Sequence, residues 1–393
     1  MRKDSEFGNE NLDVALRMLL RWCLSRDFNG IDPYDALNSP FANVLTFGSR
    51  FGRMALTQLL RRSPVNLRPL LRIQPGANPK ALGLFLEGVT KLARSGDDSF
   101  DYRAIAESLT SRLLRLRSDG LSGSSWGYNF PWQNRLSYKP PYMPTIVNTS
   151  FIGHALLDAY EEFGFQEALE AALSTPDFIL NDIPRLRVSD GEHCFSYSPC
   201  EETYVHNANL LGASLLARIG AAYGRKDVLD PALSAARYSL NRCREDGSWF
   251  YAERREQRWI DSFHTGFNLE SIRRMLNLGL IAEGRSTYDK AVEFYARHFF
   301  LSDGTPLYYA DRLYLVDVHA PAEGICFFAE EPNRETLVRS IFNWFMANLW
   351  NSKNGTFYFR KTKYYAIKTV YMRWSLAWAF RALATLMAAR KNA

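Results

Sequence analysis

Apolar residues recur at three- and four-residue steps in five long segments of the chain, which is the spacing of amphipathic helices. Shorter segments with the same spacing lie between them and upstream of them. The pattern therefore predicts a chain of helix pairs. The long segments are 147–164, 205–224, 263–280, 316–330 and 368–391, and the shorter ones are 12–26, 79–94, 101–118, 166–180, 227–243, 285–299 and 333–349.

A short loop rich in glycine and aromatic residues precedes each long segment. Each loop combines a turn signal with alternating aromatic residues, which predicts a small hairpin or an extended excursion. The turn-rich stretch 28–40 supplies a sixth loop. The five aromatic loops are 123–132, 191–199, 246–253, 303–312 and 354–365.

A polar residue stands at the head of every long segment. Aligning these heads gives Asn148, His206, His264, His319 and Arg373, at steps of 58, 58, 55 and 54 residues. Such even spacing indicates one structural position repeated along the chain. Six helical hairpins bury their apolar faces fully when they close into a ring. We therefore predict an all-α (α/α)6 toroid with short β-hairpin-like aromatic loops at one mouth; an open superhelical solenoid is the alternative.

The composition is that of a water-soluble globular chain. Apolar residues make up 47% of the 393 residues and charged residues 23%. We expect a single domain over 1–393, with a flexible N-terminus at 1–10.

No uninterrupted apolar stretch reaches the length of a transmembrane helix, and no secretion signal is evident. Together with five cysteines, an odd and sparse set, these features predict a cytoplasmic protein.

The net charge of +6 comes from 48 basic and 42 acidic residues spread along the chain. This charge weakly favours an anionic ligand. No nucleic-acid-binding motif supports a nucleic-acid partner, so none is predicted.

Several motifs together resemble a known group of proteins. The stretches "NGIDPYDALNSP", "WGYNFPWQ", "VHNANLLGASLLAR", "WIDSFHTGFNLES" and "VDVHAPAEG" are similar to polysaccharide-biosynthesis proteins of bacterial exopolysaccharide and lipopolysaccharide clusters. That group belongs to the six-hairpin glycosidase-like (α/α)6 toroids. The resemblance implies an oligosaccharide or polysaccharide ligand, free or lipid-linked, and association with other polysaccharide-biosynthesis enzymes. The wider group contains hydrolases, lyases and epimerases, so the fold does not choose the reaction.

Two sets of residues are candidates for the site, because the heads and the aromatic loops should meet at one mouth. Histidine is not a preferred helix cap, so capping does not explain three histidines at a repeated position. Aromatic rings with polar edges suit the faces of sugars. The catalytic candidates are His206, His264, His319, Asp261, Asp317, Arg373, Tyr251 and Tyr364, and the substrate-binding candidates are Asn148, Asn207, Asn209, Asn268, Trp126, Tyr128, Trp132, Trp249, Asp32 and Asp35.

These candidates leave several reactions open. Glycoside hydrolysis needs two facing carboxyl groups, for which Asp261 and Asp317 are available. A lyase or epimerase acting on a uronic acid needs cationic or amide groups around the carboxylate and an acid–base pair of histidine and tyrosine. We expect acid–base chemistry on an acidic saccharide; a non-catalytic saccharide-binding or assembly factor is the alternative.

No cofactor and no metal are predicted. Zinc bound by His206, His264 and His319 is a minor alternative, because their spacing matches no zinc motif.

Overall fold

A computed structural model describes residues 9–135 and 137–391. The flexible terminus predicted at 1–10 falls mainly on residues 1–8, which lie outside the described residues, and helix α1 begins at Asn9. Every helix in the described ranges falls short of the length and apolarity that a membrane span requires.

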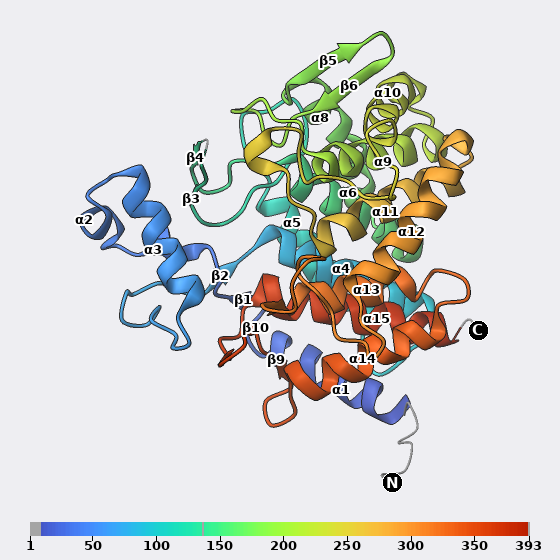
Figure 1. The fold of residues 1–393 in the computed structure, drawn as a ribbon. Helices are drawn as coiled ribbons and strands as arrows, with labels where there is room; N and C mark the ends of the chain where they lie inside the picture. Colours follow the sequence, from blue (N-terminus) through green and yellow to red (C-terminus); the bar gives the residue numbers. More distant parts are fainter. Residues whose placement is uncertain (1–8, 136, 392–393) are drawn as a thin grey trace.

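Six helices form a closed inner ring. Each contacts the next in chain order, and the last, α15, packs against the first, α4, so the ring has no free end. This closure confirms the predicted (α/α)6 toroid and removes the open solenoid (Figure 1). The inner helices are α4 (Pro79–Arg94), α6 (Ile146–Phe163), α9 (His206–Ala222), α11 (Ser262–Asn277), α13 (His319–Phe328) and α15 (Trp378–Lys391), with a π-helical turn at Met372–Ala377 leading into α15.

Outer helices surround this ring, and each packs against an inner one, α5 on α4 and α10 on α9 for example. The inner helices are buried on nearly all faces because they touch neighbours on both sides as well as the outer layer. The outer helices keep one polar face toward solvent, which explains their clearer amphipathic pattern. They are α1 (Asn9–Leu24), α5 (Tyr102–Arg115), α7 (Gln166–Leu173) with α8 (Thr175–Asn181), α10 (Leu229–Leu240), α12 (Arg285–Phe299) and α14 (Glu335–Leu349).

Short antiparallel strands occupy part of the predicted aromatic loops. The loops at 246–253 and 303–312 contribute isolated bridges, such as Val205 with Ala252 and Asp261 with Tyr309, in place of paired strands. The paired strands are β3 (Trp132–Gln133) with β4 (Tyr138–Lys139), β5 (Arg185–Ser189) with β6 (Glu192–Phe195), β8 (Trp350–Asn351) with β9 (Thr356–Phe357), and β10 (Arg360–Lys361) between β7 (Val316–Asp317) and β11 (Ala366–Ile367).

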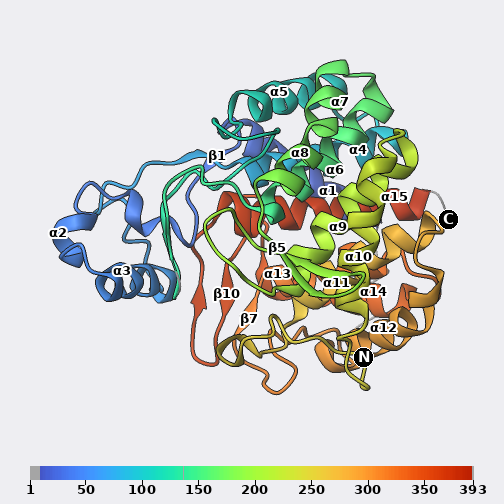
Figure 2. The same cartoon turned by 90° about the horizontal axis from the view of Figure 1, so that it is seen from above.

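The stretch predicted as a sixth loop at 28–40 begins a much longer excursion from the ring, residues 31–75. Strands β1 (Asn29–Gly30) and β2 (Gly76–Ala77) pair antiparallel and close its base. It carries the short helix α2 (Ala42–Thr46) and the longer α3 (Arg50–Arg62), neither of which was predicted. Both views show these helices projecting to one side of the ring (Figure 1, Figure 2).

Candidate functional site

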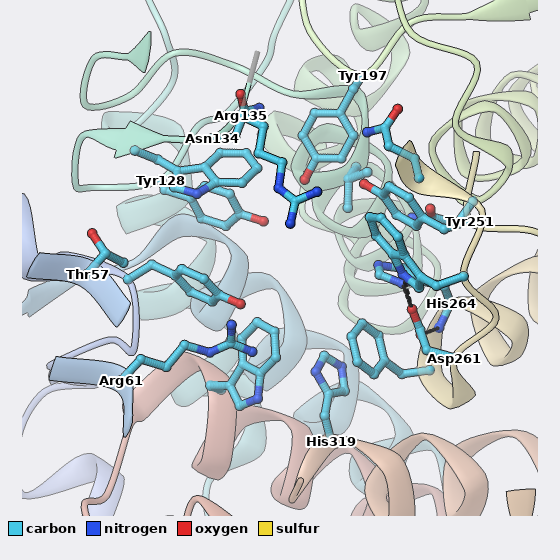
Figure 3. Close-up of a pocket in the computed structure, with 18 of the residues that line it drawn as sticks. Thr57, Arg61, Tyr128, Asn134, Arg135, Tyr197, Tyr251, Asp261, His264 and His319 are labelled. Carbon is cyan, nitrogen blue, oxygen red and sulfur yellow. Dashed lines mark hydrogen bonds and ion pairs between the residues drawn. The ribbon is translucent and has the colours of Figure 1, made fainter. Parts of the chain in front are cut away.

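A cavity of about 860 Å³ lies where the N-terminal ends of the inner helices meet, between the ring and α3. Inner helices supply its floor, the aromatic loops supply one wall, and Thr57 and Arg61 of α3 supply the opposite wall (Figure 3). The predicted meeting of helix heads and aromatic loops at one mouth is therefore present, with α3 as an unpredicted third component.

His264 and Asp261 form a hydrogen-bonded pair at the head of α11. Nδ1 of His264 lies 2.7 Å from Oδ2 of Asp261, which also accepts a hydrogen bond from Trp259 Nε1 at 3.0 Å. The other oxygen of Asp261 accepts from the backbone N–H of His264 at 3.1 Å and so caps the helix. Because a carboxylate only accepts, this contact places a proton on Nδ1 and leaves Nε2 as the basic nitrogen of the neutral ring.

His319, at the head of the next inner helix, lies among aromatic rings at the floor of the cavity. Its ring stacks on Phe263 at 4.5 Å and lies 4.9 Å from Trp374. Burial lowers its pKa well below the usual histidine value, and the charges of Lys80 and Arg373 lower it further. Neither ring nitrogen has a hydrogen-bond partner among the described residues, so the imidazole is neutral and free to bind a ligand.

Lys80 belongs to the same floor. Its ammonium lies 4.2 Å from the centre of the Phe151 ring and 5.4 Å from those of Phe267 and Trp378. Burial lowers the pKa of Lys80 well below its ordinary value, and the charge of Arg373 acts in the same direction. An anion entering the cavity would favour the charged ammonium and reverse this shift.

Arg373 lines the cavity in a fixed orientation. Its Nε and Nη2 donate to the two oxygens of Asp32 at 2.6 and 2.8 Å, a two-point contact that holds the guanidinium plane. The guanidinium carbon lies 4.8 Å from the centre of the Tyr128 ring. Arg373 therefore presents a rigid cationic edge.

Tyrosines form much of the wall. Burial raises the pKa values of these phenols, so they remain protonated at neutral pH and can donate hydrogen bonds to a ligand. Tyr251 also stacks on Trp259 at 4.6 Å with nearly parallel rings, which makes a flat aromatic face beside His264. The tyrosines concerned are Tyr128, Tyr197, Tyr251 and Tyr308.

Eight of the sequence-predicted residues line this cavity together. They come from the α9, α11 and α13 heads, the π-helical turn and the aromatic loops. They are Asn207, His264, His319, Asp261, Arg373, Tyr251, Tyr128 and Trp132.

Three predicted carboxylates stand behind the wall and anchor its cations and rings. Asp32 holds Arg373, while Asp35 accepts from Arg68 at 2.6 Å. Burial raises the pKa of Asp35 to about 6, although Arg68 opposes that shift. Asp317 accepts from Trp374 Nε1 at 2.7 Å and from Arg360 at 2.6 Å. Asp317 therefore does not face Asp261 across the cavity, contrary to the pairing considered for a hydrolase.

His206 lies away from the cavity. Its Nδ1 meets Ser239 at 3.1 Å and its Nε2 meets Glu253 at 2.8 Å. Asn207, the second residue of α9, takes the cavity-facing place on this helix. Position within the helix does not alone set the direction, since His319 is likewise the first residue of α13 and lines the cavity. The His206 ring is instead turned away by its contacts with Ser239 and Glu253.

The remaining predicted residues also lie outside the cavity lining. Asn209 bonds backbone groups of Phe195 and Ala235. Asn148 and Asn268 are buried, with side-chain amide atoms that have no partner among the described residues. The other three are the core residues Trp126 and Trp249, whose indoles donate to backbone carbonyls, and Tyr364, which is 84% exposed.

The three histidines considered as zinc ligands do not converge. His206 and His264 are each held by different carboxylates, and His319 lies among aromatic rings. Within the described ranges, no group of three or more histidine, cysteine, aspartate or glutamate side chains is arranged to hold a metal ion.

Many cavity residues were not predicted, among them Lys80, Arg61 and Tyr34. Arg61 belongs to the unpredicted helix α3, and Tyr34 to the stretch 28–40 that was predicted only as a loop. Lys80 had a usable signal, because it follows the capping residue Asn78 and the helix-starting Pro79, as the other heads follow their caps.

No protein-family model matches the sequence, and no curated protein matches it by sequence. Among solved structures, a D-mannose isomerase matches over 98% of this chain and 99% of its own, with a TM-score of 0.63 and 12% identity. A cellobiose 2-epimerase from Bacillus thermoamylovorans matches over 81% of this chain and 90% of its own, with a TM-score of 0.62 and 11% identity. A GH76 α-mannanase from Bacteroides thetaiotaomicron matches over 79% of this chain and 85% of its own, with a TM-score of 0.54 and 13% identity. At these identities the likeness concerns the fold, and the chain has the (α/α)6 toroid that these proteins share.

Proposed function

We propose that this protein is a carbohydrate-processing enzyme that transfers a proton at a carbon of an acidic saccharide, with His264 as the base. In an epimerase of this kind, a C–H bond beside a carboxylate or carbonyl breaks and its electron pair spreads onto that group. A proton then returns to the same carbon from the opposite face. The substrate stays redox-neutral and keeps its mass.

The observation that carries this proposal is the His264–Asp261 pair within the cavity. The carboxylate fixes the ring with its Nδ1 proton toward Asp261, so Nε2 is the nitrogen available to take up a proton from the substrate. His319, neutral and without a hydrogen-bond partner among the described residues, is suited to act as the second acid–base group or to bind a hydroxyl.

Two-carboxylate glycoside hydrolysis has weaker support. Of the described residues that line the cavity, Asp261 and Glu256 are the carboxylates. Asp261 already accepts hydrogen bonds from the His264 ring, the His264 backbone and the Trp259 indole, and Glu256 is an exposed residue. No second carboxylate among the described residues is therefore buried in the cavity to act as a raised-pKa acid.

An acidic substrate is favoured by the charges of the lining. Six basic side chains, of which Lys80 has a lowered pKa, line the cavity with the two carboxylates just named, and an excess of one sign of charge concentrates ligands of the other sign. Arg61 of α3 and Arg135, which follows β3, both reach toward the centre of the cavity (Figure 3). The basic residues are Arg50, Arg61, Lys80, Arg135, Arg254 and Arg373.

The structural matches agree with a carbohydrate-processing enzyme, since they include a mannose isomerase, a cellobiose epimerase and a mannanase. The resemblance to polysaccharide-biosynthesis proteins further suggests that the substrate is a saccharide under construction, free or lipid-linked. Other enzymes of the same biosynthesis are then the expected partners.

The reaction class is tested by incubating the purified protein with uronic-acid oligosaccharides in D2O and measuring product masses. We expect products of unchanged composition that carry one carbon-bound deuterium for each sugar residue that has reacted. An unsaturated product would instead identify a lyase, which uses the same proton removal followed by loss of a leaving group. Gain of water would identify a hydrolase and overturn the proposal. Binding without any product would favour the non-catalytic saccharide-binding factor.

A further inference from the structure

The excursion formed by residues 31–75 exposes an unusual amount of apolar surface. Phe47 is 92% exposed, Phe51 79% and Val44 76%, although isolated exposed apolar residues elsewhere in the described chain rarely reach such values. A soluble monomer seldom presents so many large apolar side chains in one region without a binding role. The full set, here called the apolar tip, is Phe41, Val44, Leu45, Phe47, Phe51, Leu59, Val65 and Leu70.

One side of α3 lines the cavity and another is exposed to solvent. Thr57 and Arg61 face the cavity, while Phe51 and Leu59 are exposed on other sides of the helix, Leu59 about 200° round from Thr57. The interior of the excursion is small, a cluster of Ala36, Leu60 and Ile73 that is separate from the main core. The excursion is packed around its own small core, and the paired strands β1 and β2 close its base. The exposure of the apolar tip is therefore not a result of poor packing.

Charge indicates what covers the apolar tip. From residue 36 to residue 75 the chain has six arginines and no aspartate or glutamate. Three of them, Arg53, Arg62 and Arg72, lie outside the cavity lining and form no ion pair with any described residue, whereas Arg50 and Arg61 line the cavity and Arg68 is paired with Asp35. Two copies of this chain meeting at the tip would bring these like charges together, which opposes self-association.

We propose that the apolar tip and its arginines form a peripheral membrane-docking surface for anionic lipid bilayers. Aromatic and aliphatic side chains would enter the interface between headgroups and acyl chains, and the arginines would pair with lipid phosphates. The chain would lie on the bilayer without crossing it. Because the other face of α3 lines the cavity, docking would hold the cavity mouth beside the membrane surface, where a lipid-linked saccharide is presented.

The test is co-sedimentation of the full chain with vesicles of phosphatidylcholine alone and with about 30% phosphatidylglycerol added. We expect binding to the anionic vesicles that weakens between about 0.05 and 0.5 M salt, and little binding to the neutral ones. Phe47→Ser with Phe51→Ser should weaken binding by about tenfold or more. Arg62→Gln with Arg72→Gln should weaken it by about fivefold for each arginine.

Matched controls separate docking from general effects. Arg187 and Arg297 are exposed arginines on distant elements, and Arg187→Gln with Arg297→Gln should leave vesicle binding unchanged. The thermal unfolding of all variants should match the wild type, because the altered side chains make few contacts. Turnover of a soluble saccharide should also stay unchanged in the phenylalanine variant, so failure of docking and failure of the proposed reaction are distinguishable.

Three outcomes would overturn the inference. The first is no binding to anionic vesicles at low salt. The second is equal binding by the wild type and the phenylalanine variant. The third is a wild-type dimer in solution that the phenylalanine variant dissociates, which would make a second copy the occupant of the apolar tip.

Discussion

At the scale of single residues, Asp261 links the fold to the proposed chemistry. One of its oxygens caps α11 and the other holds the His264 ring at 2.7 Å. The Trp259 indole donates to the same oxygen and keeps the carboxylate from rotating. The orientation of the proposed base is therefore set by the same residue that starts its helix.

Replacing Asp261 by asparagine should separate these two roles. Asparagine caps helices about as well as aspartate, so the free energy of unfolding should change by no more than about 1 kcal/mol. Its amide, however, donates to Nδ1 and moves the ring proton to Nε2, which removes the base. We expect kcat to fall by about 100-fold or more, measured by steady-state kinetics alongside thermal unfolding.

Asp101→Asn is the matched control for this substitution. Asp101 caps α5 with the same kind of contact, accepting from the Ala104 backbone N–H at 2.9 Å, and it lies outside the cavity lining. Equal losses of activity in the two variants would show that Asp261 acts only through the fold.

At the scale of elements, the inner helices pack closely where small residues meet large rings. A Cβ added at Gly88 of α4 would lie 2.7 Å from Cε1 of Phe380 on α15, and real contacts of this kind are essentially never that short. Gly88 and Phe380 lie in the contact between α4 and α15 that closes the ring.

Gly88→Ala should therefore destabilise the protein. Alanine within a helix ordinarily gains up to about 1 kcal/mol over glycine. Here we expect a net loss of about 1–3 kcal/mol in the free energy of unfolding, because Phe380 must move. Chemical denaturation measures this value, and a stabilised variant would show that the α4–α15 contact is looser than described.

The elements also show what the sequence allowed us to predict. The ring helices were predictable because apolar residues recur in them at helical spacing, and each inner and outer helix of the ring falls on a predicted segment. Helix α3 was missed because its apolar residues are divided between the small core, as with Leu60, and solvent, as with Phe51. A divided pattern has no single apolar stripe to detect.

The site was predictable to the level of helix heads, and less so for side-chain direction. His264 and His319 reach the cavity, while His206 is held by Ser239 and Glu253 and the next residue, Asn207, lines the cavity in its place. The spacing of repeats along the chain did not resolve this shift of one residue along α9. The contribution of Arg61 could not be predicted either, because it depends on how the excursion folds back over the ring.

At the scale of the whole molecule, buried neutral histidines should make stability depend on pH. Burial lowers the pKa values of His154 and His319 well below the usual value and that of His193 to about 4. In the unfolded chain these groups take up protons near pH 6.5, whereas in the folded chain they stay neutral. Their contribution to stability is therefore complete above about pH 6.5 and is lost as the pH falls through the folded pKa values.

We expect the free energy of unfolding to decrease from about pH 6.5 to pH 5 by up to about 1.4 kcal/mol per pH unit for each such histidine. Denaturant titrations at several pH values measure this slope. His193→Gln removes one titrating group and should flatten the slope, and an unchanged slope would exclude His193 as a contributor.

The most direct test of the whole account compares two histidine variants in the D2O assay, using the uronic-acid oligosaccharide that the wild type turns over. His264 lines the cavity, and His206 occupies a repeated head position but faces Ser239 and Glu253. We predict that His264→Gln slows deuterium incorporation at carbon by about 100-fold or more while His206→Gln, if folded by circular dichroism, stays within a few-fold of the wild type. Full incorporation by His264→Gln would contradict the assignment of His264 as the base.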